Sequence, residues 1–269
     1  MSPDEPLCMK QNRLFELQRP IIFAHRGSSA YAPENTLASF ELALKQNVNA
    51  IELDATLTKD QKVVVFHDSS TERITGFKGK INQMNLAEIR KLDAGSFFDA
   101  SFQGERIPTL EEVFDLVRDR ALINIELKNY ANPLDSLPQQ VATLIEKWKL
   151  HENIFFSSFN PVALWKIKRL LPEVPIALLA LDGKQGWLAR SRFGEILAYQ
   201  AIHPYYEDVN PNFLSDHHQK GHLVNVYTVN NATIMRSLFE MGIDGIFTDD
   251  PLLAQEQRKA FKPCTEKDS

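Results

Sequence analysis

The sequence predicts a closed (β/α)₈ barrel, because apolar runs of strand length alternate with helical patterns along most of its 269 residues. About eight such units in a chain of this length are typical of one barrel. A doubly wound open sheet is the alternative, but no Gly-x-Gly-x-x-Gly motif follows the first apolar run. We therefore expect a single barrel domain over residues 20–262, preceded by an N-terminal extension over residues 1–19.

The expected strands are short runs rich in Ile, Val, Leu and Phe. In chain order they cover residues 21–25, 50–54, 63–68, 122–128, 154–159, 175–181, 201–204, 223–229 and 245–249. The expected helices cover residues 35–46, 109–120, 134–148, 160–171, 213–220, 232–242 and a stretch from Pro251, with a weaker pattern over 187–197. Alternation of this kind gives parallel strands joined by crossover helices.

One interval, residues 69–107, is too long for an ordinary strand-to-helix connection, since these usually take about 2–6 residues. It begins directly after His67 and Asp68, and it contains an aromatic cluster formed by Phe97, Phe98 and Phe102. From this position we expect a small insertion subdomain over the mouth of the barrel. A tolerated surface insertion is the alternative interpretation.

Composition excludes several classes of protein. Hydrophobic residues are 43% and charged residues 24%, which is ordinary for a globular domain and unlike disordered or fibrous chains. The net charge of −5 disfavours a nucleic-acid partner, which would need a basic face. No run approaches the roughly 18 apolar residues of a membrane span, and the N-terminus lacks a secretory pattern. We expect no stable membrane insertion and a cytoplasmic location, and a homodimer stays open.

Ionisable residues gather where the expected strands end, which is the edge that carries the active site in barrel enzymes. Four consecutive runs end on His25 and Arg26, on Glu52 and Asp54, on His67 and Asp68, and on Glu126 and Lys128. Residues two apart on a strand share one face, so the paired side chains of the second and fourth of these strands point together. The sequence therefore predicts a convergent polar site inside this rim.

Three carboxylates in this site, those of Glu52, Asp54 and Glu126, would repel one another unless a cation lies among them. Oxygen ligands without cysteine favour a hard ion, so we expect one divalent cation, Mg²⁺ or Ca²⁺. The alternative is a set of ion pairs that joins Lys128 to Glu126 and Arg26 to Asp54.

Two histidines, His25 and His67, are the candidates for acid–base chemistry, because imidazole both takes and gives a proton near neutral pH. A lone histidine in an apolar strand is more often a core residue, but two at neighbouring strand ends favour catalysis. His203 also ends a run and is a weaker candidate for the rim. With the cations of Arg26 and Lys128, the set suits phosphate chemistry, which needs charge neutralisation, a base and an acid.

An ordered series of motifs now resembles the glycerophosphodiester phosphodiesterase family, in its bacterial cytosolic form. The motifs are HRG (25–27), PENT (33–36), ELD (52–54), HD (67–68), GERIPTLEE (104–112), ELK (126–128), VYTVN (226–230) and DGIFTDDP (244–251). The resemblance implies a TIM barrel with a small insertion after the second histidine motif. It also implies metal-dependent hydrolysis of glycerophosphodiesters, such as glycerophosphocholine or glycerophosphoethanolamine, to glycerol 3-phosphate and an alcohol.

The resemblance implies a role for each matching position. Glu52, Asp54 and Glu126 would be the metal ligands, His25 and His67 the general acid and base, Arg26 and Lys128 the phosphate-binding cations, and Glu34 and Asn35 supporting residues. Phe159 and Tyr227 are expected to contact the substrate, and Tyr227 stands where the family often has Trp. Either histidine fits the role of the acid, and the nucleophile is either water or the substrate's own glycerol hydroxyl.

Two other functions stay open on the sequence alone. A lysophospholipase D would perform the same chemistry on an acylated substrate and would want an apolar entrance, which the phenylalanines of the insertion together with Phe159 could form. A non-catalytic barrel that binds a phosphate ligand is the alternative from another class. Such a protein normally lacks one of the catalytic histidines or one of the carboxylates that would bind the metal. Here the two histidines and the three carboxylates are all present.

Overall fold

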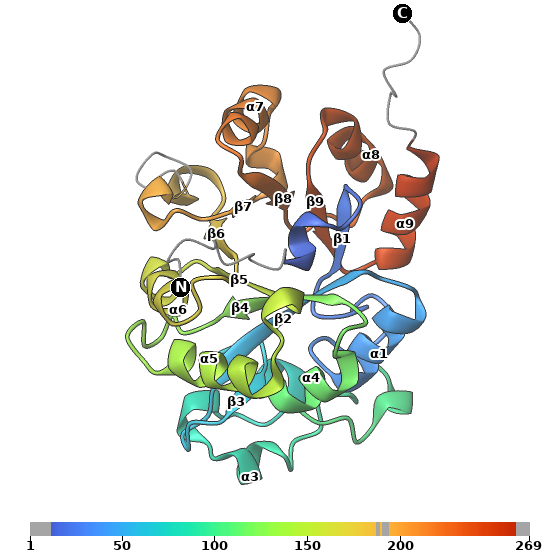
Figure 1. Cartoon of the computed structure of the whole chain (residues 1–269). Helices are drawn as coiled ribbons and strands as arrows, with labels where there is room; N and C mark the ends of the chain where they lie inside the picture. The colour runs from blue at the N-terminus through green and yellow to red at the C-terminus, as the bar shows by residue number, and fades with distance from the viewer. Residues whose placement is uncertain (1–11, 187–188, 190–193, 262–269) are drawn as a thin grey trace, which may run out of the picture.

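The computed structural model describes residues 12–186, 189 and 194–261. Eight parallel strands close into a ring in the order β1-β9-β8-β7-β6-β5-β4-β2, with β2 pairing back to β1. Their bounds are β1 (Ile21–Ala24), β2 (Ala50–Leu57), β4 (Leu122–Leu127), β5 (Ile154–Ser158), β6 (Ile176–Ala180), β7 (Ala201–Pro204), β8 (Leu223–Val226) and β9 (Gly245–Thr248). Figure 1 shows the ring with helices around it, which confirms the predicted (β/α)₈ barrel.

The main helices lie close to their predicted positions. They are α1 (Leu37–Lys45), α4 (Leu110–Val117), α5 (Leu137–Trp148), α6 (Pro161–Leu170), α7 (Pro211–Gln219), α8 (Ala232–Met241) and α9 (Pro251–Ala260). Most begin at a polar residue whose side chain accepts a hydrogen bond from the first turn, as Thr36 and Thr109 do. The predicted helix over 187–197 lies largely outside the described residues, and its described end, Gly194–Leu197, is a 3₁₀ turn (η6).

The barrel has two apolar layers. One lies between the strands and the surrounding helices, and the other fills the amino-terminal end of the ring. In the second layer the rings of Phe23, Phe155 and Phe247 pack together, with centroids 4.6 and 5.7 Å apart. Leu14, in the short 3₁₀ helix η1 (Arg13–Phe15), is buried against this layer, so the described part of the predicted N-terminal extension packs on the barrel. The opposite end of the ring is therefore the one available for a site.

The third predicted strand is not a barrel strand, and the expectation of four consecutive parallel strand ends is wrong at this point. β3 (Val63–Val65) runs antiparallel to the outer part of β2, with Val63 opposite Leu57. The five residues between them form a tight turn, which is too short for a parallel crossover of about a dozen residues. The backbone N–H of Phe66 donates to the carbonyl of Asp54 at 2.9 Å. The hairpin thus returns His67 to the level of Asp54.

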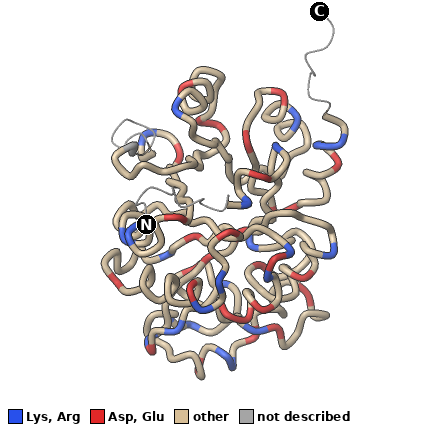
Figure 2. The backbone as a smooth tube through the Cα atoms, viewed as in Figure 1, with Lys and Arg blue, Asp and Glu red and all other residues tan. Residues whose placement is uncertain are grey.

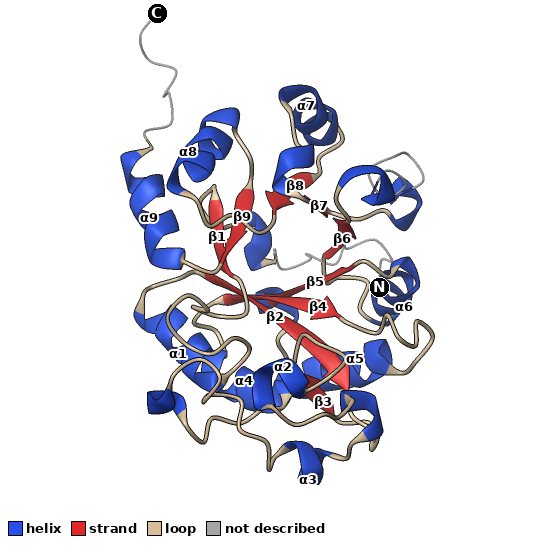
Figure 3. Cartoon of the chain, turned by 180° about the vertical axis from the view of Figure 1, so that it is seen from behind, coloured by secondary structure: helices blue, strands red, loops and turns tan. Residues whose placement is uncertain are grey.

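The insertion lies beside the barrel. It contains α2 (Glu72–Thr75), η2 (Ile81–Gln83), α3 (Leu86–Ile89) and η3 (Ala100–Phe102). Its apolar residues form a small core with Val64 and Phe66 of the hairpin, and in Figures 1 and 3 α3 lies to one side of the ring of strands. The insertion thus buries its apolar side chains against the flank of the hairpin, and its expected position over the mouth of the barrel stays a prediction.

Charge is distributed over the whole of the described chain. Figure 2 shows Lys and Arg interspersed with Asp and Glu along the barrel and its helices. Among the described residues, no helix combines the length and the apolar character that crossing a bilayer requires.

Candidate functional site

A pocket of about 260 Å³ lies at the carboxyl ends of the strands. It is lined by nine of the residues singled out in the sequence, namely His25, Arg26, Glu52, His67, Glu126, Lys128, Phe159, His203 and Tyr227. A larger cleft of about 710 Å³ shares His67 and Lys128 with this pocket. One wall of the cleft comes from the start of the insertion, at Ser69, Ser70, Ile81 and Asn82. Phe97, Phe98 and Phe102 line neither cavity.

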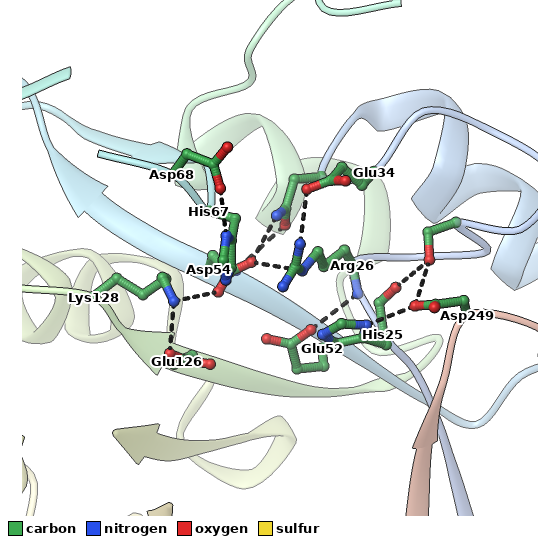
Figure 4. Close-up of polar contacts among 12 residues, drawn as sticks. His25, Arg26, Glu34, Glu52, Asp54, His67, Asp68, Glu126, Lys128 and Asp249 are labelled. Atoms are coloured by element: carbon green, nitrogen blue, oxygen red, sulfur yellow. Dashed lines mark hydrogen bonds and ion pairs between the residues drawn. The ribbon is translucent and has the colours of Figure 1, made fainter. Parts of the chain in front are cut away.

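Strand register brings the three predicted carboxylates together. Asp54 on β2 and Glu126 on β4 are paired across neighbouring strands, and Glu52 lies two residues before Asp54 on the same face. Each of the three offers an oxygen within 4.8 Å of the others, and Figure 4 shows them pointing into the same region as both histidines. Glu52 is 3% exposed and Asp54 is 1% exposed, so two of these charges are held away from water.

The ion pairs named as the alternative are present, but they leave buried oxygens unsatisfied. Lys128 donates to Glu126 at 3.0 Å and lies 3.5 Å from Asp54, whose other oxygen lies 3.3 Å from Nε of Arg26. Even so, Oε1 of Glu52 and Oδ1 of Asp54 have no hydrogen-bond partner among the described residues. Buried polar atoms are rarely left in this state. Three converging carboxylates with two unsatisfied oxygens fit a hard divalent cation.

The electrostatics of the cluster agree with this fit. Burial, followed by repulsion from Asp54 and Glu126, raises the pKa of Glu52 well above its usual value. Burial acts in the same direction on Asp54, but the charges of Lys128 and Arg26 outweigh it and lower the pKa of Asp54. Burial would lower the pKa of Lys128, yet Asp54 and Glu126 raise it, so this amine stays charged. The raised pKa of Glu52 means that a third negative charge in this cluster is unfavourable unless a further cation lies beside it.

Each predicted histidine is held by a carboxylate through the same ring nitrogen. Nδ1 of His25 lies 2.7 Å from Oδ1 of Asp249, and Nδ1 of His67 lies 2.6 Å from Oδ1 of Asp68. Burial alone would raise the pKa of Asp249, but hydrogen bonds from His25, Asn230 and Ser29 hold it at about 2. An ionised carboxylate accepts, so Nδ1 of His25 donates to it. Nε2 is then the ring nitrogen left to exchange a proton in the pocket.

A left-handed turn after β1 explains the His-Arg-Gly motif. Arg26 and Gly27 have φ values of +58° and +85°, and a Cβ at Gly27 would meet the hydroxyl oxygen of Ser39. Only glycine fits that second position. The turn directs the backbone N–H of Arg26 to Glu52 at 2.9 Å. The Arg26 side chain meanwhile donates to Glu34 at 2.9 Å.

The supporting role expected for Asn35 has a clear geometry. Its side-chain amide donates to Oδ2 of Asp54 at 2.8 Å, and its carbonyl oxygen accepts from the backbone N–H of Asp54 at 3.3 Å. Asn35 adopts φ +56°, a conformation that Asn tolerates better than most residues. These two bonds fix the orientation of the Asp54 carboxylate.

Aromatic side chains form the other wall of the pocket. The rings of Phe159 and Tyr227 meet edge to face with centroids 6.0 Å apart, and the Tyr227 hydroxyl donates to the carbonyl of Ala180 at 2.7 Å. Tyr130, which the sequence reasoning missed, packs against Phe159 and donates its hydroxyl to Glu126 at 2.6 Å. The residue as a whole is 39% exposed, but its hydroxyl is turned inward onto the carboxylate.

Two further residues of the site were missed or underrated. Asp249 lies within the DGIFTDDP motif, directly after β9, and only closure of the barrel places it beside His25, because β9 pairs with β1. His203 is fully buried in the pocket wall, and its Nε2 lies 3.2 Å from the amide nitrogen of Asn225. Burial lowers the pKa of His203 to about 3, so its imidazole is neutral in the folded protein.

Comparison with known proteins identifies relatives over nearly the whole chain. A glycerophosphodiester phosphodiesterase from Caldanaerobacter subterraneus is 37% identical over 235 residues, which cover 87% of this chain and 95% of that protein. A glycerophosphodiester phosphodiesterase from Bacillus subtilis is 32% identical, covering 93% of this chain and 90% of the relative.

Solved structures agree with these relatives. An Oleispira antarctica phosphodiesterase, in complex with the product sn-glycerol 3-phosphate, matches with a TM-score of 0.83 at 32% identity, over 89% of this chain and 97% of that chain. A glycerophosphodiester phosphodiesterase from Thermotoga maritima matches with a TM-score of 0.71 at 29% identity, over 89% and 99%. The sequence profile of the Glycerophosphoryl diester phosphodiesterase family matches residues 25–253. The chain therefore belongs to this family and is a glycerophosphodiester phosphodiesterase.

Proposed function

We propose that this enzyme hydrolyses small glycerophosphodiesters, such as glycerophosphocholine or glycerophosphoethanolamine, to glycerol 3-phosphate and an alcohol, with one divalent cation and two histidines. The observation that carries the proposal is the carboxylate cluster with its two unsatisfied buried oxygens, beside two histidines that are each held by an acid. The glycerol 3-phosphate complex of the Oleispira relative supports the same product here. Relatives that share this activity do not favour a lysophospholipase D or a non-catalytic barrel.

Glu52, Asp54 and Glu126 would hold the cation, Mg²⁺ or Ca²⁺, through carboxylate oxygens. Bound there, the cation would supply positive charge to the phosphate oxygens during hydrolysis. Arg26 and Lys128 line the same pocket and stay charged, so they add to the electrostatic attraction for a phosphodiester. Phe159 and Tyr227 contact the carbon skeleton of the substrate from the opposite wall.

The two histidines move the protons. One accepts a proton at Nε2 from the nucleophile as its oxygen bonds to phosphorus, and the other donates a proton to the alcohol oxygen as its bond to phosphorus breaks. With water as the nucleophile, the products form directly. With the substrate's own glycerol hydroxyl, a cyclic phosphate forms first and water opens it, with the two histidines exchanging roles.

Single histidine substitutions test this assignment. We expect His25→Ala and His67→Ala each to lower kcat by about 10²-fold or more, the usual scale for acid–base catalysis. His218→Ala is the matched control, because His218 also pairs with an aspartate, Asp244 at 2.8 Å, but lies outside the pocket lining. Near-normal turnover by His25→Ala or His67→Ala, in a variant shown to be folded, would contradict the assignment.

A further inference from the structure

A single arginine of the insertion joins two carboxylates of the site. Arg73, in α2, donates from Nε to Oδ2 of Asp68 at 2.6 Å and from Nη2 to Oδ1 of the same group at 3.2 Å. It also donates from Nη1 and Nη2 to the two oxygens of Glu34, both at 2.8 Å. One planar guanidinium therefore makes two-point contacts with both acids, a geometry that lysine has no means of reproducing.

Each of these acids orients a different group of the pocket. Asp68 holds Nδ1 of His67 at 2.6 Å, and Glu34 accepts from Nη1 of Arg26 at 2.9 Å. Figure 4 shows Asp68 beside His67 and Glu34 beside Arg26. Through Arg73 the acid–base histidine and the phosphate-binding arginine belong to one continuous network of charged hydrogen bonds.

The backbone that carries Arg73 is firmly placed. Its neighbour Ile74 is 3% exposed and packs in the small core of the insertion with Phe66, the residue that precedes His67. Thr71 is fully buried, and its hydroxyl donates to the carbonyl of Phe77 at 2.6 Å. Gly76 ends the helix at φ +69°. The guanidinium therefore projects from a fixed turn toward the loop that follows β1.

Contact with Arg73 affects the pKa values of Glu34 and Asp68. Burial acts to raise the pKa values of Glu34 and Asp68, but the hydrogen bonds and charge of Arg73, together with those of Arg26 at Glu34 and of His67 at Asp68, lower both pKa values. Both acids therefore stay ionised, which is the form that accepts hydrogen bonds from Arg26 and His67.

We propose that Arg73 is a positioning residue for the reaction, which couples the orientation of His67 to that of Arg26 across the boundary between insertion and barrel. The proposal rests on the proposed function, because it assigns chemistry to His67 and phosphate binding to Arg26. The proposal gives the insertion a role that does not require it to cover the mouth of the barrel. In this role the insertion places the guanidinium of Arg73 at the rim of the barrel.

A second arginine of the insertion provides a matched control. Arg90 makes a two-point contact with Glu112, at 2.6 and 2.8 Å, and so ties the insertion to the barrel helix α4. It touches neither Asp68 nor Glu34. If Arg73 served only to attach the insertion, Arg73→Ala and Arg90→Ala would have similar effects.

Steady-state kinetics with glycerophosphocholine separate these cases, with thermal unfolding used to confirm that each variant is folded. We expect Arg73→Ala to lower kcat/KM by about 10–100-fold, the scale typical for residues that orient active-site groups. Asp68→Asn should act mainly on kcat and Glu34→Gln mainly on KM, whereas Arg73→Ala should change both. Arg73→Lys should recover only part of the loss, and Arg90→Ala should keep wild-type kinetics. Arg73→Gln serves as the second variant if the alanine variant does not fold.

Double variants give the decisive result. Arg73→Ala should cost less in kcat when Asp68 is already Asn, and less in KM when Glu34 is already Gln, because the shared network is already broken. If the effects of the single substitutions on kcat and KM are fully additive in the double variants, the inference about Arg73 is overturned. It is also overturned if Arg73→Ala keeps wild-type kinetics while His67→Ala is inactive. Both results would leave the proposed function standing. Near-normal turnover by His67→Ala would overturn the proposed function, and the inference with it.

Discussion

Oδ1 of Asp249 lies 2.7 Å from Nδ1 of His25, although 224 positions separate the two residues in the chain. The contact exists because β9 pairs with β1 and closes the ring, with Thr248 opposite Ala24. The orientation of the first histidine therefore depends on the last strand of the barrel. This relationship leads to the first of four predictions.

We predict that Asp249→Asn lowers kcat by at least about 10-fold with little change in KM, because the amide neither stabilises a positive imidazole nor selects its Nδ1–H tautomer. The measurement is steady-state hydrolysis of glycerophosphocholine. Asp250→Ala is the neighbouring control: Asp250 caps α9 through the N–H of Leu253 and accepts from Tyr31, so its loss should lower the melting temperature and spare kcat. Equal kcat losses in both variants would mean that Asp249 acts through stability.

The second prediction concerns Tyr130, whose hydroxyl donates to the same Glu126 oxygen as Lys128. Tyr130→Phe removes one of the two bonds that orient a proposed metal ligand, so the apparent affinity for the activating cation should fall by about 10-fold or more. At saturating cation, turnover should return close to the wild-type value. Tyr31→Phe, which removes a tyrosine–aspartate bond outside the pocket lining, should leave the cation dependence unchanged. An unaltered cation titration for Tyr130→Phe would argue against Glu126 as a ligand.

The third prediction follows from the buried charge of Glu52. Without a bound cation, Glu52→Gln should raise the melting temperature, because it removes a buried carboxylate that Asp54 and Glu126 repel. With millimolar Mg²⁺ or Ca²⁺ the wild type should become more stable and the variant should respond much less, since a ligand that binds only the folded state stabilises it. Thermal unfolding at several cation concentrations measures both effects. Equal stabilisation of the two proteins would contradict a cation site at Glu52.

The fourth prediction uses the pH dependence of stability. The pKa of His203 is lowered to about 3 by burial, so the folded protein keeps this imidazole neutral while the unfolded chain takes up a proton below about pH 6.5. Its contribution to stability is therefore complete above about pH 6.5 and is lost as the pH falls toward 3. Between pH 7 and pH 5 the free energy of unfolding should drop by about 2 kcal/mol more in the wild type than in His203→Gln. Parallel curves for the two proteins would show that His203 is protonated or exposed when folded.

Local patterns in the sequence account for much of the site. The alternation of side chains along a strand was enough to predict that Glu52 and Asp54 share a face and that strand ends converge. The strand prediction failed at β3, because a short apolar run does not reveal whether the chain crosses over or turns back. The sequence could not have placed His67 by the route that the structure uses, which is a hairpin that returns to Asp54.

Long-range contacts account for what was missed. Asp249 reaches His25 only through closure of the ring, and Arg73 reaches Glu34 only after the insertion has folded against the flank of the hairpin. The DGIFTDDP motif contains Asp249 but does not reveal that it reaches His25, and Arg73 lies in no motif that distinguishes it from other charged residues. The phenylalanines of the insertion, for which a place at an apolar entrance was left open, lie outside the lining of both cavities.

The most direct test of the central claim is the release of glycerol 3-phosphate from glycerophosphocholine by the purified enzyme, measured after chelation with EDTA and again after Mg²⁺ or Ca²⁺ is restored. The account predicts loss of activity in EDTA, recovery with the added cation in the wild type, and no recovery in Asp54→Asn or Glu126→Gln. Undiminished product release in EDTA by the wild type, or by a folded Glu126→Gln variant, would contradict a mechanism in which these carboxylates hold a required cation.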